Sequence, residues 1–565
     1  MVFDGWIYNR EELQAVAGVD ELDNAGLMLE AYRRLARDLL PRVKGRFALL
    51  IWDGTNGELH CARDPLGTYP LFYAERGDEL LLSSGIEDLV SCPGVATELN
   101  RTVLAEHLSS RWPSLEDTYY AGVRRVPPGH LMSFGAGPPS SYRYWDPVPT
   151  PDSDSWISEK EVDQFDEAFY QAVNRCLELG PPGVFLSGGL DSVSVATVAT
   201  DSQRSRQMPP PWGLSLVFPH PDTNEEVVQR GVADTLGIPQ LLLGFDEAVG
   251  PRGRLLATVE GSRTAPTPLM GLWSPAYWRL AAEGRERGCK VILTGGGGDE
   301  MLSFSPYLAA DRLRDLDLPG LWRLFRARHR ASSEPTWRMA RAVFWRNAAQ
   351  PLLNRTARRA LNAVAPSLLR ARLRGHIRDG IPSWVRPDPE LAHQLEERGV
   401  NQIAKWPPRS SFYYHESRSW LDHPVASFEM ERVFEEGRLA GVPILEPYWD
   451  PDLQEFLYHV PPELLMQGGL TKGLVRGMLD RRFPELGFGQ QKKVVGASFA
   501  YETFESQVPK ALREMGGAPG LAQLGVVDQQ RLEEALARFS VAPDRRTSNQ
   551  LFHVLSLEAW VSPRL

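Results

Sequence analysis

Hydrophobic and polar positions divide the chain into two parts of different character. Residues 1 to about 150 contain short apolar runs of strand length, at 47–52, 58–62, 71–74 and 79–83. Turn residues separate these runs, including Asp53-Gly54 and Asn56-Gly57, which favour hairpins. Apolar residues at helical spacing predict a helix over about 21–38. We therefore expect a β-rich first part.

The second part shows the pattern of an α/β fold. It follows a stretch at 147–155 that is rich in Pro, Asp and Ser and is predicted to be a linker. Predicted strands then alternate with helices, and from about residue 310 the chain is predicted to be helical to its end. The strands are expected at 183–186, 212–218, 240–243 and 290–293. This alternation predicts a parallel sheet wrapped by helices, and so two domains at 1–150 and 151–565.

Composition narrows the classes of protein. The 565 residues carry a formal net charge of −10, which gives no reason to expect a nucleic-acid partner. The four cysteines are scattered without a CxxC pair, which argues against a zinc site or disulfide framework and suits a reducing cytoplasm. No run of 18 apolar residues predicts a membrane span, and no signal peptide is apparent. Arg far outnumbers Lys, so the eight lysines stand out.

The first chemical motif is a Gly-rich turn at the end of an apolar strand. It comprises Ser187, Gly188, Gly189, Leu190, Asp191 and Ser192. Glycines let a backbone approach an anion closely, and the N–H groups at the following helix start point at it. The spacing matches neither the P-loop nor the dinucleotide-binding fingerprint. The hexapeptide resembles the pyrophosphate-binding loop of ATP pyrophosphatases, which cut ATP between the α and β phosphates and adenylate a substrate.

A second Gly-rich turn follows the predicted strand at 290–293. It contains four glycines, 295–298, and is closed by Asp299 and Glu300. Binding sites of open parallel sheets lie beyond the carboxyl ends of the strands. Mg²⁺ is typically held by one or two carboxylates together with phosphate oxygens. We therefore expect Asp191 and Asp299 to hold Mg²⁺; the alternative is that the acids merely begin a helix, where they favour its dipole.

The chain resembles the glutamine-dependent asparagine synthetases over nearly its whole length. In the first part the matching segments are Phe3 to Leu13, Gly45 to Ala48, Ala62 to Gly67, Pro70 to Tyr73 and Pro127 to His130. In the second part they are 187–192, Asp222 to Glu226, Leu236-Gly237, 295–300, Glu446 to Asp450 and Gln490 to Lys493. The resemblance implies an Ntn-hydrolase-like glutaminase domain followed by an ATP-pyrophosphatase domain.

The glutaminase part departs from the family. The family's nucleophile is an N-terminal Cys, whereas this chain begins Met1-Val2 and its first cysteine is Cys61. The family's Asn-Gly-Glu, which helps form the oxyanion hole and grips glutamine, is here Asp4-Gly5-Trp6. An Asp carboxylate cannot donate a hydrogen bond to an oxyanion, and Trp removes the charge that would hold the glutamine amine. We expect a degenerate domain that releases no ammonia.

The resemblance also implies roles for individual residues in the second part. ATP would lie across 187–192, with its adenine against Leu186, Leu216 and Gly295. The family places a Lys after Arg-Gln near the tetrahedral intermediate. Gln491-Lys492 matches that pattern, so Lys492 is the first candidate for this cation and Lys493 the second, against the alternative of a solvated surface pair.

Two further departures concern the substrate. Where asparagine synthetases have a Glu, and β-lactam synthetase a catalytic Tyr, this chain has Gly296, which suggests added space for a bulkier substrate. The family's Glu-Ala-Arg-Val-Pro-Phe-Leu-Asp is here Pro443 to Asp450, without the first Glu and the Arg. The contacts for a free amino acid are therefore expected to be lost.

Without ammonia, the nucleophile must come from the substrate itself. The resemblance then favours a lasso peptide cyclase, which activates an Asp or Glu side chain of a precursor peptide and closes a macrolactam with the peptide's N-terminal amine. Such cyclases work beside a leader-binding protein and a leader peptidase, so both are expected partners. A β-lactam-type synthetase and ammonia-dependent asparagine synthesis remain alternatives, and a catalytically inactive scaffold is disfavoured by the intact motifs.

An Arg-rich block covers 321–380, with arginines among apolar positions. Basic amphipathic helices can bind acidic partners, membranes or nucleic acid, but a solvated helix face is the favoured interpretation. If the block binds anything, an acidic peptide or a partner protein is expected.

Overall fold

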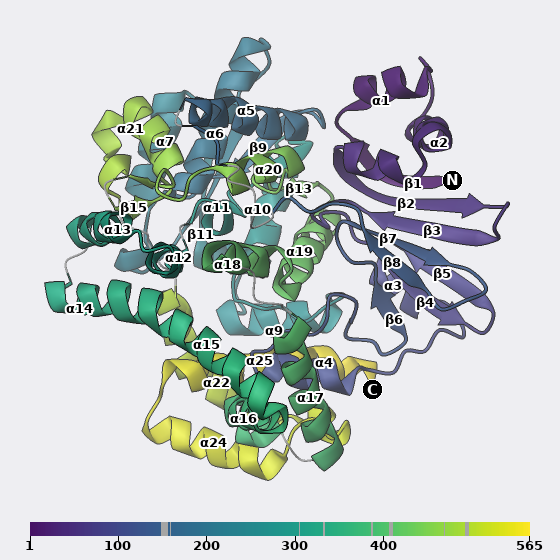
Figure 1. Ribbon diagram of the computed structural model, residues 1–565, viewed down its shortest axis with the longest axis vertical. Helices are drawn as coiled ribbons and strands as arrows, with labels where there is room; N and C mark the ends of the chain where they lie inside the picture. The colour runs from purple at the N-terminus through teal and green to yellow at the C-terminus, as the bar shows by residue number, and fades with distance from the viewer. Residues whose placement is uncertain are drawn as a thin grey trace.

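The structure is a computed structural model that describes residues 1–148, 156–158, 160–303, 305–331, 334–385, 388–405, 411–467, 469–491 and 497–565. Most of the predicted linker, and both Lys492 and Lys493, lie outside the described residues. Figure 1 shows a β-rich N-terminal part beside a larger body of helices around a central sheet. This is the mixed α/β organisation that the sequence predicted.

The N-terminal part contains two antiparallel sheets. The first has strand order β1-β2-β3-β7-β8 and the second β5-β4-β6. The predicted hairpin turn after Asp53 joins β2 to β3, where Asp53 pairs with Glu58. A small core that includes Ala48, Cys61 and Tyr73 is buried between the sheets. The strands are β1 (Val2–Ile7), β2 (Gly45–Asp53), β3 (Glu58–Arg63), β4 (Phe72–Arg76), β5 (Glu79–Ser83), β6 (Val123–Arg125), β7 (His130–Phe134) and β8 (Ser140–Arg143).

Helices cover the outer side and one end of these sheets. The predicted helix at 21–38 is α2, which Asp23 caps by accepting a hydrogen bond from the Gly26 N–H, and it continues as the 3₁₀-helix η1. Together with α1 it covers the first sheet, as Figure 1 shows. The helices of this part are α1 (Arg10–Ala17), α2 (Asn24–Leu35), η1 (Ala36–Arg42), α3 (Ile86–Val90) and α4 (Arg101–Leu108).

A five-stranded parallel sheet is the centre of the second part. Its strand order is β11-β10-β9-β12-β13. The strands are β9 (Pro182–Phe185), β10 (Trp212–Val217), β11 (Gln240–Gly244), β12 (Val291–Leu293) and β13 (Ile444–Leu445). Four of them were predicted, but β13 lies in the stretch that was expected to be wholly helical, and that expectation was wrong. Two residues are too short a run to be recognised as a strand from sequence.

Residues of one strand alternate between two cores on the sheet's faces. In β12, Val291 and Leu293 join the larger core, whereas Ile292 joins the core on the opposite face. The larger core packs α5 (Gln164–Leu177), α6 (Leu190–Ser205), α7 (Glu226–Leu236), α20 (Pro451–His459) and α21 (Gly473–Arg482). The opposite core packs α8 (Phe245–Val249), α10 (Ser274–Glu286) and α19 (Pro424–Ala440). Burial on both faces explains the near-continuous apolar strands.

A third core joins the C-terminal helices to the end of the N-terminal part. Its central element is α25 (Arg545–Val561), which packs against α4, α9 (Arg254–Thr264) and α22 (Ala497–Glu514). Outside the Arg-rich block, the remaining helices and strands are α11 (Gly298–Met301), α12 (Leu308–Arg314), α17 (Pro389–Lys405), α18 (Phe412–Leu421), α23 (Pro519–Gln523), α24 (Gln529–Val541), β14 (Met466–Gln467) and β15 (Leu470–Thr471). The short 3₁₀-helices are η2 (Glu161–Asp163), η3 (Pro221–Thr223), η5 (Ser383–Val385), η6 (Pro484–Leu486), η7 (Phe488–Gln490) and η8 (Ser562–Arg564).

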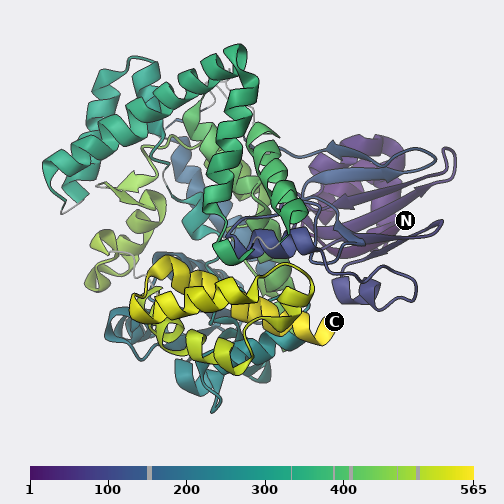
Figure 2. The ribbon, with the colours of Figure 1, turned by 90° about the horizontal axis from the view of Figure 1, so that it is seen from below.

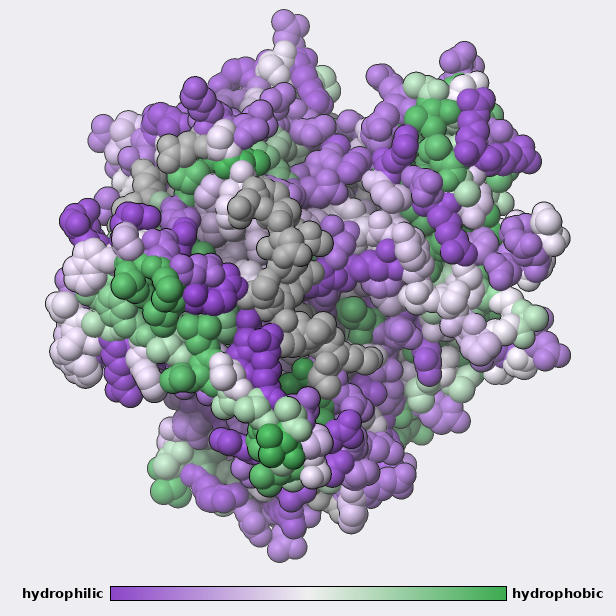
Figure 3. Space-filling view, in the orientation of Figure 1, coloured by the Kyte–Doolittle hydropathy of each residue, from purple (hydrophilic) through white to green (hydrophobic). Residues whose placement is uncertain are grey.

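The Arg-rich block forms a helical arm of α13 (Leu318–Ala331), α14 (Thr336–Ala340), the π-helix η4 (Arg341–Ala349), α15 (Gln350–Val364) and α16 (Pro366–Gly380). These teal helices form one edge of the molecule in Figure 2. None of the residues of α15 is buried. Apolar surface gathers over the α13–η4 part of the face in Figure 3. In the same elements, Trp322, Trp337 and Trp345 are at least half exposed. The arm is thus largely solvated, as the sequence favoured.

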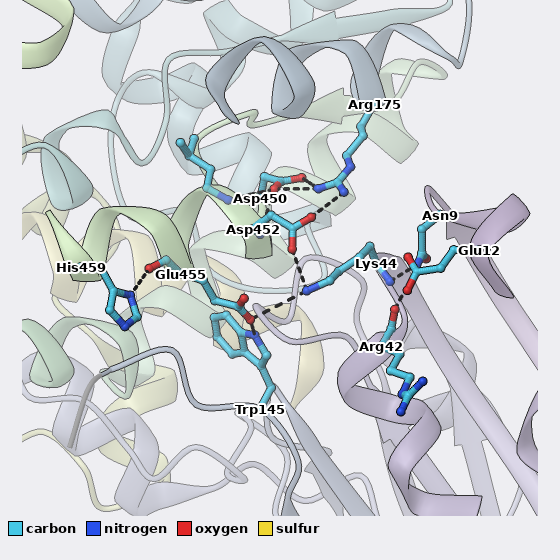
Figure 4. Close-up of polar contacts among 11 residues, drawn as sticks. Asn9, Glu12, Arg42, Lys44, Trp145, Arg175, Asp450, Asp452, Glu455 and His459 are labelled. Carbon is cyan, nitrogen blue, oxygen red and sulfur yellow. Dashed lines mark hydrogen bonds and ion pairs between the residues drawn. The ribbon is translucent and has the colours of Figure 1, made fainter. Parts of the chain in front are cut away.

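Polar contacts join the N-terminal part to the second part (Figure 4). Lys44 Nζ lies 2.6 Å from Asp452 Oδ1, and Trp145 Nε1 donates to Glu455 Oε1 at 2.6 Å; both acids belong to α20. Arg175 of α5 donates to the second Asp452 oxygen at 2.6 Å, so this carboxylate is shared between the two parts. The interface fixes α20 relative to the N-terminal sheets.

A buried ionic cluster strengthens the same interface. Glu431 of α19 accepts hydrogen bonds from Arg125 Nη2 at 2.8 Å and from Arg63 Nη1 at 3.1 Å. All three side chains are nearly inaccessible to solvent. Burial lowers the pKa of Arg63, although Glu431 opposes that shift. Because a buried charge without a partner is costly, this cluster makes the N-terminal part a structural component of the whole.

Within the described ranges, no helix is both long enough and apolar enough to cross a membrane.

Candidate active site

The two Gly-rich turns lie side by side at one edge of the parallel sheet. Strands β9 and β12 are neighbours, with Val184 paired to Leu293, and each turn follows the carboxyl end of its strand. The strand order reverses direction between these two strands, because β10 and β11 lie on one side and β13 on the other. Such a switch point is where open α/β sheets bind ligands.

Hydrogen bonds within 187–192 hold the first turn in shape. Ser192 Oγ accepts from the Ser187 N–H at 3.1 Å, and the two hydroxyl groups are 2.8 Å apart. The Gly189 N–H donates to Ser187 Oγ at 3.1 Å, and helix α6 begins at Leu190. The hydroxyl groups of the two serines therefore stabilise the conformation of the loop.

The loop already presents a backbone donor to an anion. The Gly188 N–H donates to Glu225 Oε2 at 3.1 Å. Burial raises the pKa of Glu225, and the Gly188 hydrogen bond opposes this rise. Gln491 Nε2 donates to the Gly188 carbonyl at 2.8 Å, which brings the residue before Lys492 to the loop. The contact from a carboxylate oxygen supports the prediction that this turn can receive a phosphate oxygen.

The second turn needs its glycines because the first turn packs against it. A Cβ on Gly295 would lie 2.6 Å from the Ser192 backbone nitrogen, and one on Gly298 would overlap the Asp191 carboxylate. The close approach brings Asp191 beside Asp299, as the sequence predicted for a shared site. The short helix α11 begins at Gly298 and carries Asp299 and Glu300 in its first turn.

The two carboxylates converge on one cation, the ammonium group of Lys472. Lys472 Nζ lies 2.7 Å from Asp299 Oδ1 and also pairs with Asp191 Oδ2. Burial disfavours the charged form, but the ion pairs outweigh it and raise the pKa of Lys472. Oxygen ligands that meet at one positive charge fit the requirements of Mg²⁺, which takes one or two carboxylates with phosphate oxygens. The two carboxylates therefore fit the predicted ion, and their role as its ligands stays a prediction.

Sequence reasoning missed Lys472. It is the N-cap of α21 and has a left-handed backbone (φ 66°), a conformation that a lysine rarely adopts and that its neighbours in sequence do not reveal. The scarcity of lysine was the available signal, because Lys472 is one of only eight. The predicted candidates Lys492 and Lys493 lie outside the described residues, so their role stays a prediction.

A cavity of about 480 Å³, here the loop cavity, opens beside the first turn. Its walls include Ser187, Phe218, Thr223, Glu225, Trp273, Tyr277, Glu429 and Arg432. The predicted adenine contacts Leu186 and Leu216 are only 1% and 4% exposed, and each belongs to a core of the sheet. They position the strand ends that flank the cavity, whereas its surface comes from other residues.

A second cavity, of about 430 Å³, opens beside the Asp299 turn. It is called the aromatic cavity here because Tyr413, Trp420 and Tyr458 contribute to its walls. Asp299 and Glu300 line it too, so it adjoins the pair of carboxylates. Burial and the neighbouring Asp299 raise the pKa of Glu300. One cavity beside each Gly-rich turn suits a reaction that joins a nucleotide to a second molecule.

The expectation that Gly296 leaves added space was wrong. A Cβ on Gly296 would overlap the carboxylate of Glu446, so another side chain fills that volume. Glu446 directly follows β13, and its side chain is buried with 6% exposure. Burial, with a smaller contribution from Glu429, raises its pKa to about 8. The Glu446 carboxylate thus fills the volume that a side chain at position 296 would enter.

The altered glutaminase residues pack against their surroundings. Asp4 Oδ2 accepts from Ser84 Oγ at 3.1 Å. Trp6 contacts Tyr69 edge to face with ring centres 5.9 Å apart, and Tyr69 contacts Phe434 of α19 at 4.9 Å. These three aromatic residues line an interdomain cavity of about 240 Å³ together with Arg46 and Glu446. Apolar contacts occupy the place where the resemblance implied a glutamine-binding charge.

Comparisons with known proteins agree with this arrangement. A family model described as asparagine synthase matches residues 164–562, and one described as glutamine amidotransferase domain matches residues 1–145. Asparagine synthetase (glutamine-hydrolyzing) 3 of Bacillus subtilis is 29% identical over 215 residues, 35% of this chain and 33% of its own length. Asparagine synthetase (glutamine-hydrolyzing) 1 of the same organism is 26% identical over 314 residues, 53% and 47% of the two lengths.

A third relative matches over more of the chain. Amidase chyE of Penicillium rubens is 25% identical over 491 residues, 81% of this chain and 70% of its own length. The matches to the two asparagine synthetases span a third to about a half of those proteins. Because the asparagine synthase model covers well over half of the chain, this protein belongs to the asparagine synthase family.

Proposed function

We propose that this protein is an ATP-dependent, AMP-forming lasso peptide cyclase. It would adenylate an Asp or Glu side chain of a precursor peptide and close a macrolactam with the peptide's N-terminal amine. The observation that carries the proposal is the convergence of Asp191 and Asp299 on one cation at neighbouring strand ends. That arrangement supports the adenylation half of the reaction.

The choice of an internal amine rests on the N-terminal part. Asp4 is hydrogen-bonded to Ser84, and Trp6 packs on Tyr69, so neither offers the contacts that glutamine hydrolysis needs. A synthetase without its own ammonia source requires a substrate that carries the amine. The aromatic cavity adjoins Asp299 and offers apolar walls to a peptide side chain and its neighbours.

The chain's own residues divide the work as follows. The 187–192 loop would offer its backbone N–H groups to the phosphates, and Asp191 and Asp299 would hold Mg²⁺, which would supply positive charge to offset that of the leaving pyrophosphate. The substrate carboxylate attacks the α-phosphate to form an acyl-adenylate. The amine then attacks the acyl carbon, the new amide bond forms, and AMP leaves. Lys492 remains the first candidate to stabilise the anionic tetrahedral intermediate, and Lys493 the second.

Two other activities of the same chemistry remain candidates. A β-lactam-type cyclisation of a small β-amino acid would use the same adenylation step, but Gly296 replaces the family's catalytic Tyr. Ammonia-dependent asparagine synthesis would need a free amino acid to be held where Pro443 to Asp450 has lost the family's first Glu and Arg. Both predict turnover of small molecules without a peptide.

The test is intact-mass analysis after incubation with ATP, Mg²⁺ and leader-free peptides. Each peptide carries an N-terminal Gly and an Asp or Glu at position seven to nine. Loss of one water with AMP formation supports ring closure, and Asp191→Asn should abolish both products. No AMP with any peptide, together with turnover of aspartate plus ammonia or of a β-amino acid, would overturn the proposal. A leader-binding protein and a leader peptidase are the partners to add when the peptide still carries its leader.

A further inference from the structure

Glu446 lies at the same sheet edge as the Gly-rich turn that carries Asp299. Strands β12 and β13 are parallel neighbours, with Leu293 paired to Leu445, and the Thr294 N–H donates to the Leu445 carbonyl at 2.9 Å. Gly296 and Glu446 therefore follow adjacent strand ends. The overlap of a Gly296 Cβ with Glu446 Oε1 places the carboxylate where a side chain from the turn would begin.

The Glu446 carboxylate is poorly satisfied for a buried group. Its Oε2 atom has no hydrogen-bond partner among the residues that the structure describes. The nearby Arg46 guanidinium donates to the Glu446 backbone carbonyl, at 3.0 Å. Because buried polar atoms are nearly always hydrogen-bonded, this oxygen is a candidate to contact a substrate.

Charged groups from three elements surround the carboxylate. Glu429 and Arg432 belong to α19, Glu300 to α11, and Arg46 to β2. Burial raises the pKa most, Glu429 and Glu300 raise it further, and the two arginines oppose them, with a result of about 8. Glu429 lines the loop cavity and Glu300 the aromatic cavity, whereas Glu446 itself lines the interdomain cavity. A proton acceptor works best with a pKa near the working pH.

We propose that Glu446 is the proton acceptor for the amine that attacks the acyl-adenylate, an inference that rests on the proposed amide-forming function. The amine nitrogen forms the C–N bond and the C–O bond to AMP breaks. The proton released by the nitrogen passes to the Glu446 carboxylate, and AMP departs with the bonding electron pair. Adenylation precedes this step and does not need the Glu446 proton site.

The test separates the two half-reactions in Glu446→Gln, which keeps the size of the side chain. ATP–pyrophosphate exchange with the accepted substrate should persist, whereas amide formation should fall about 10²- to 10⁴-fold, the usual contribution of a positioned base. Hydroxylamine, a nucleophile that is neutral at pH 7 and needs no base, should still trap the adenylate as a hydroxamate. Glu435→Gln, on α19 and outside the site, is the matched control and should change neither reaction.

A double variant that restores the carboxylate from the neighbouring turn distinguishes a catalytic role of Glu446 from a packing role. Glu446→Ala should lose amide formation, and Glu446→Ala combined with Gly296→Glu should recover it, because the second strand end then supplies the carboxylate. A pH profile alone would be ambiguous, since an α-amine titrates with a pKa near 8 as well.

The outcomes separate this inference from the proposed function. Amide formation that is unchanged in Glu446→Gln would overturn the inference, and loss of exchange together with amide formation would assign Glu446 to adenylation or folding instead. Failure of the wild type with every peptide would overturn the cyclase proposal alone. The same variants would then be assayed with whichever small substrate supports exchange.

Discussion

The ammonium group of Lys472 lies 2.7 Å from Asp299 Oδ1 and at the same time pairs with Asp191. These carboxylates come from different Gly-rich turns, and without a cation between them they would repel each other. Lys472→Met should therefore lower the melting temperature in the absence of divalent ions. Added Mg²⁺ should raise the melting temperature of this variant more than that of the wild type, because binding to the native state stabilises it. The melting temperatures are measured by differential scanning calorimetry. An equal Mg²⁺-induced rise in both proteins would show that Lys472 and Mg²⁺ do not occupy the same place.

The lysine pair after Gln491 gives the second prediction. Gln491 is hydrogen-bonded to the Gly188 carbonyl, so it is tied to the phosphate-binding turn. Lys492→Ala should therefore reduce amide formation far more than Lys493→Ala, since a fixed cation stabilises the developing oxyanion. Steady-state AMP release with each variant measures this difference. Equal or reversed effects would contradict the assignment of Lys492.

Much of the site was predictable because it depends on local sequence. Each Gly-rich turn follows an apolar strand, and the rule that parallel strands present their carboxyl ends at one edge brought Asp191 and Asp299 together. Lys472 and Glu446 were not predictable in this way. Lys472 reaches the carboxylates through a left-handed residue at the start of α21, and Glu446 follows a strand of only two residues. Their positions depend on tertiary packing across more than a hundred residues.

The same contrast explains the error at Gly296. A glycine in place of a larger residue indicates empty space only when the neighbours are known. Here the neighbour is Glu446, which the sequence separates from Gly296 by 150 positions and the sheet brings into contact. A side chain at one strand end that fills the space beside a neighbouring strand end cannot be recognised without the strand order.

Glutamine provides the third prediction. Incubation with glutamine should release no glutamate above the uncatalysed rate, because Asp4 cannot donate to an oxyanion and Trp6 is packed against Tyr69. Glutamate release measured by coupled dehydrogenase assay tests this prediction. Wild-type hydrolysis would contradict the structural role of the N-terminal part.

The buried Glu431 cluster gives the fourth prediction. Glu431→Gln would leave Arg63 and Arg125 without their shared carboxylate in a region that solvent does not reach. Breaking a buried ion pair in this way costs about 3–5 kcal/mol. Urea denaturation should show that loss in the free energy of unfolding, whereas Glu435→Gln on the same helix should change it much less, because its partner Arg438 is half-exposed and can be solvated. A loss below about 1 kcal/mol, the range of exposed pairs, would show that the interface does not depend on this cluster.

Glu446 leads to a prediction about stability that is independent of any substrate. Its folded-state pKa is about 8, against an ordinary value of 4.5. Between these pH values the native state keeps a proton that the unfolded state has released, so the free energy of unfolding falls as pH rises from about 4.5 to about 8.

Glu446→Gln removes this dependence, because an amide does not titrate. The variant should be close to the wild type in stability at pH 5 and more stable at pH 9, by an amount on the order of a few kcal/mol, since each pKa unit corresponds to about 1.4 kcal/mol. Melting temperatures across pH 5–9 measure the difference. A parallel pair of curves for wild type and Glu446→Gln would mean that Glu446 ionises normally. A gain in stability coupled to a loss of amide formation would indicate that the buried carboxylate is retained for the reaction at the expense of the fold.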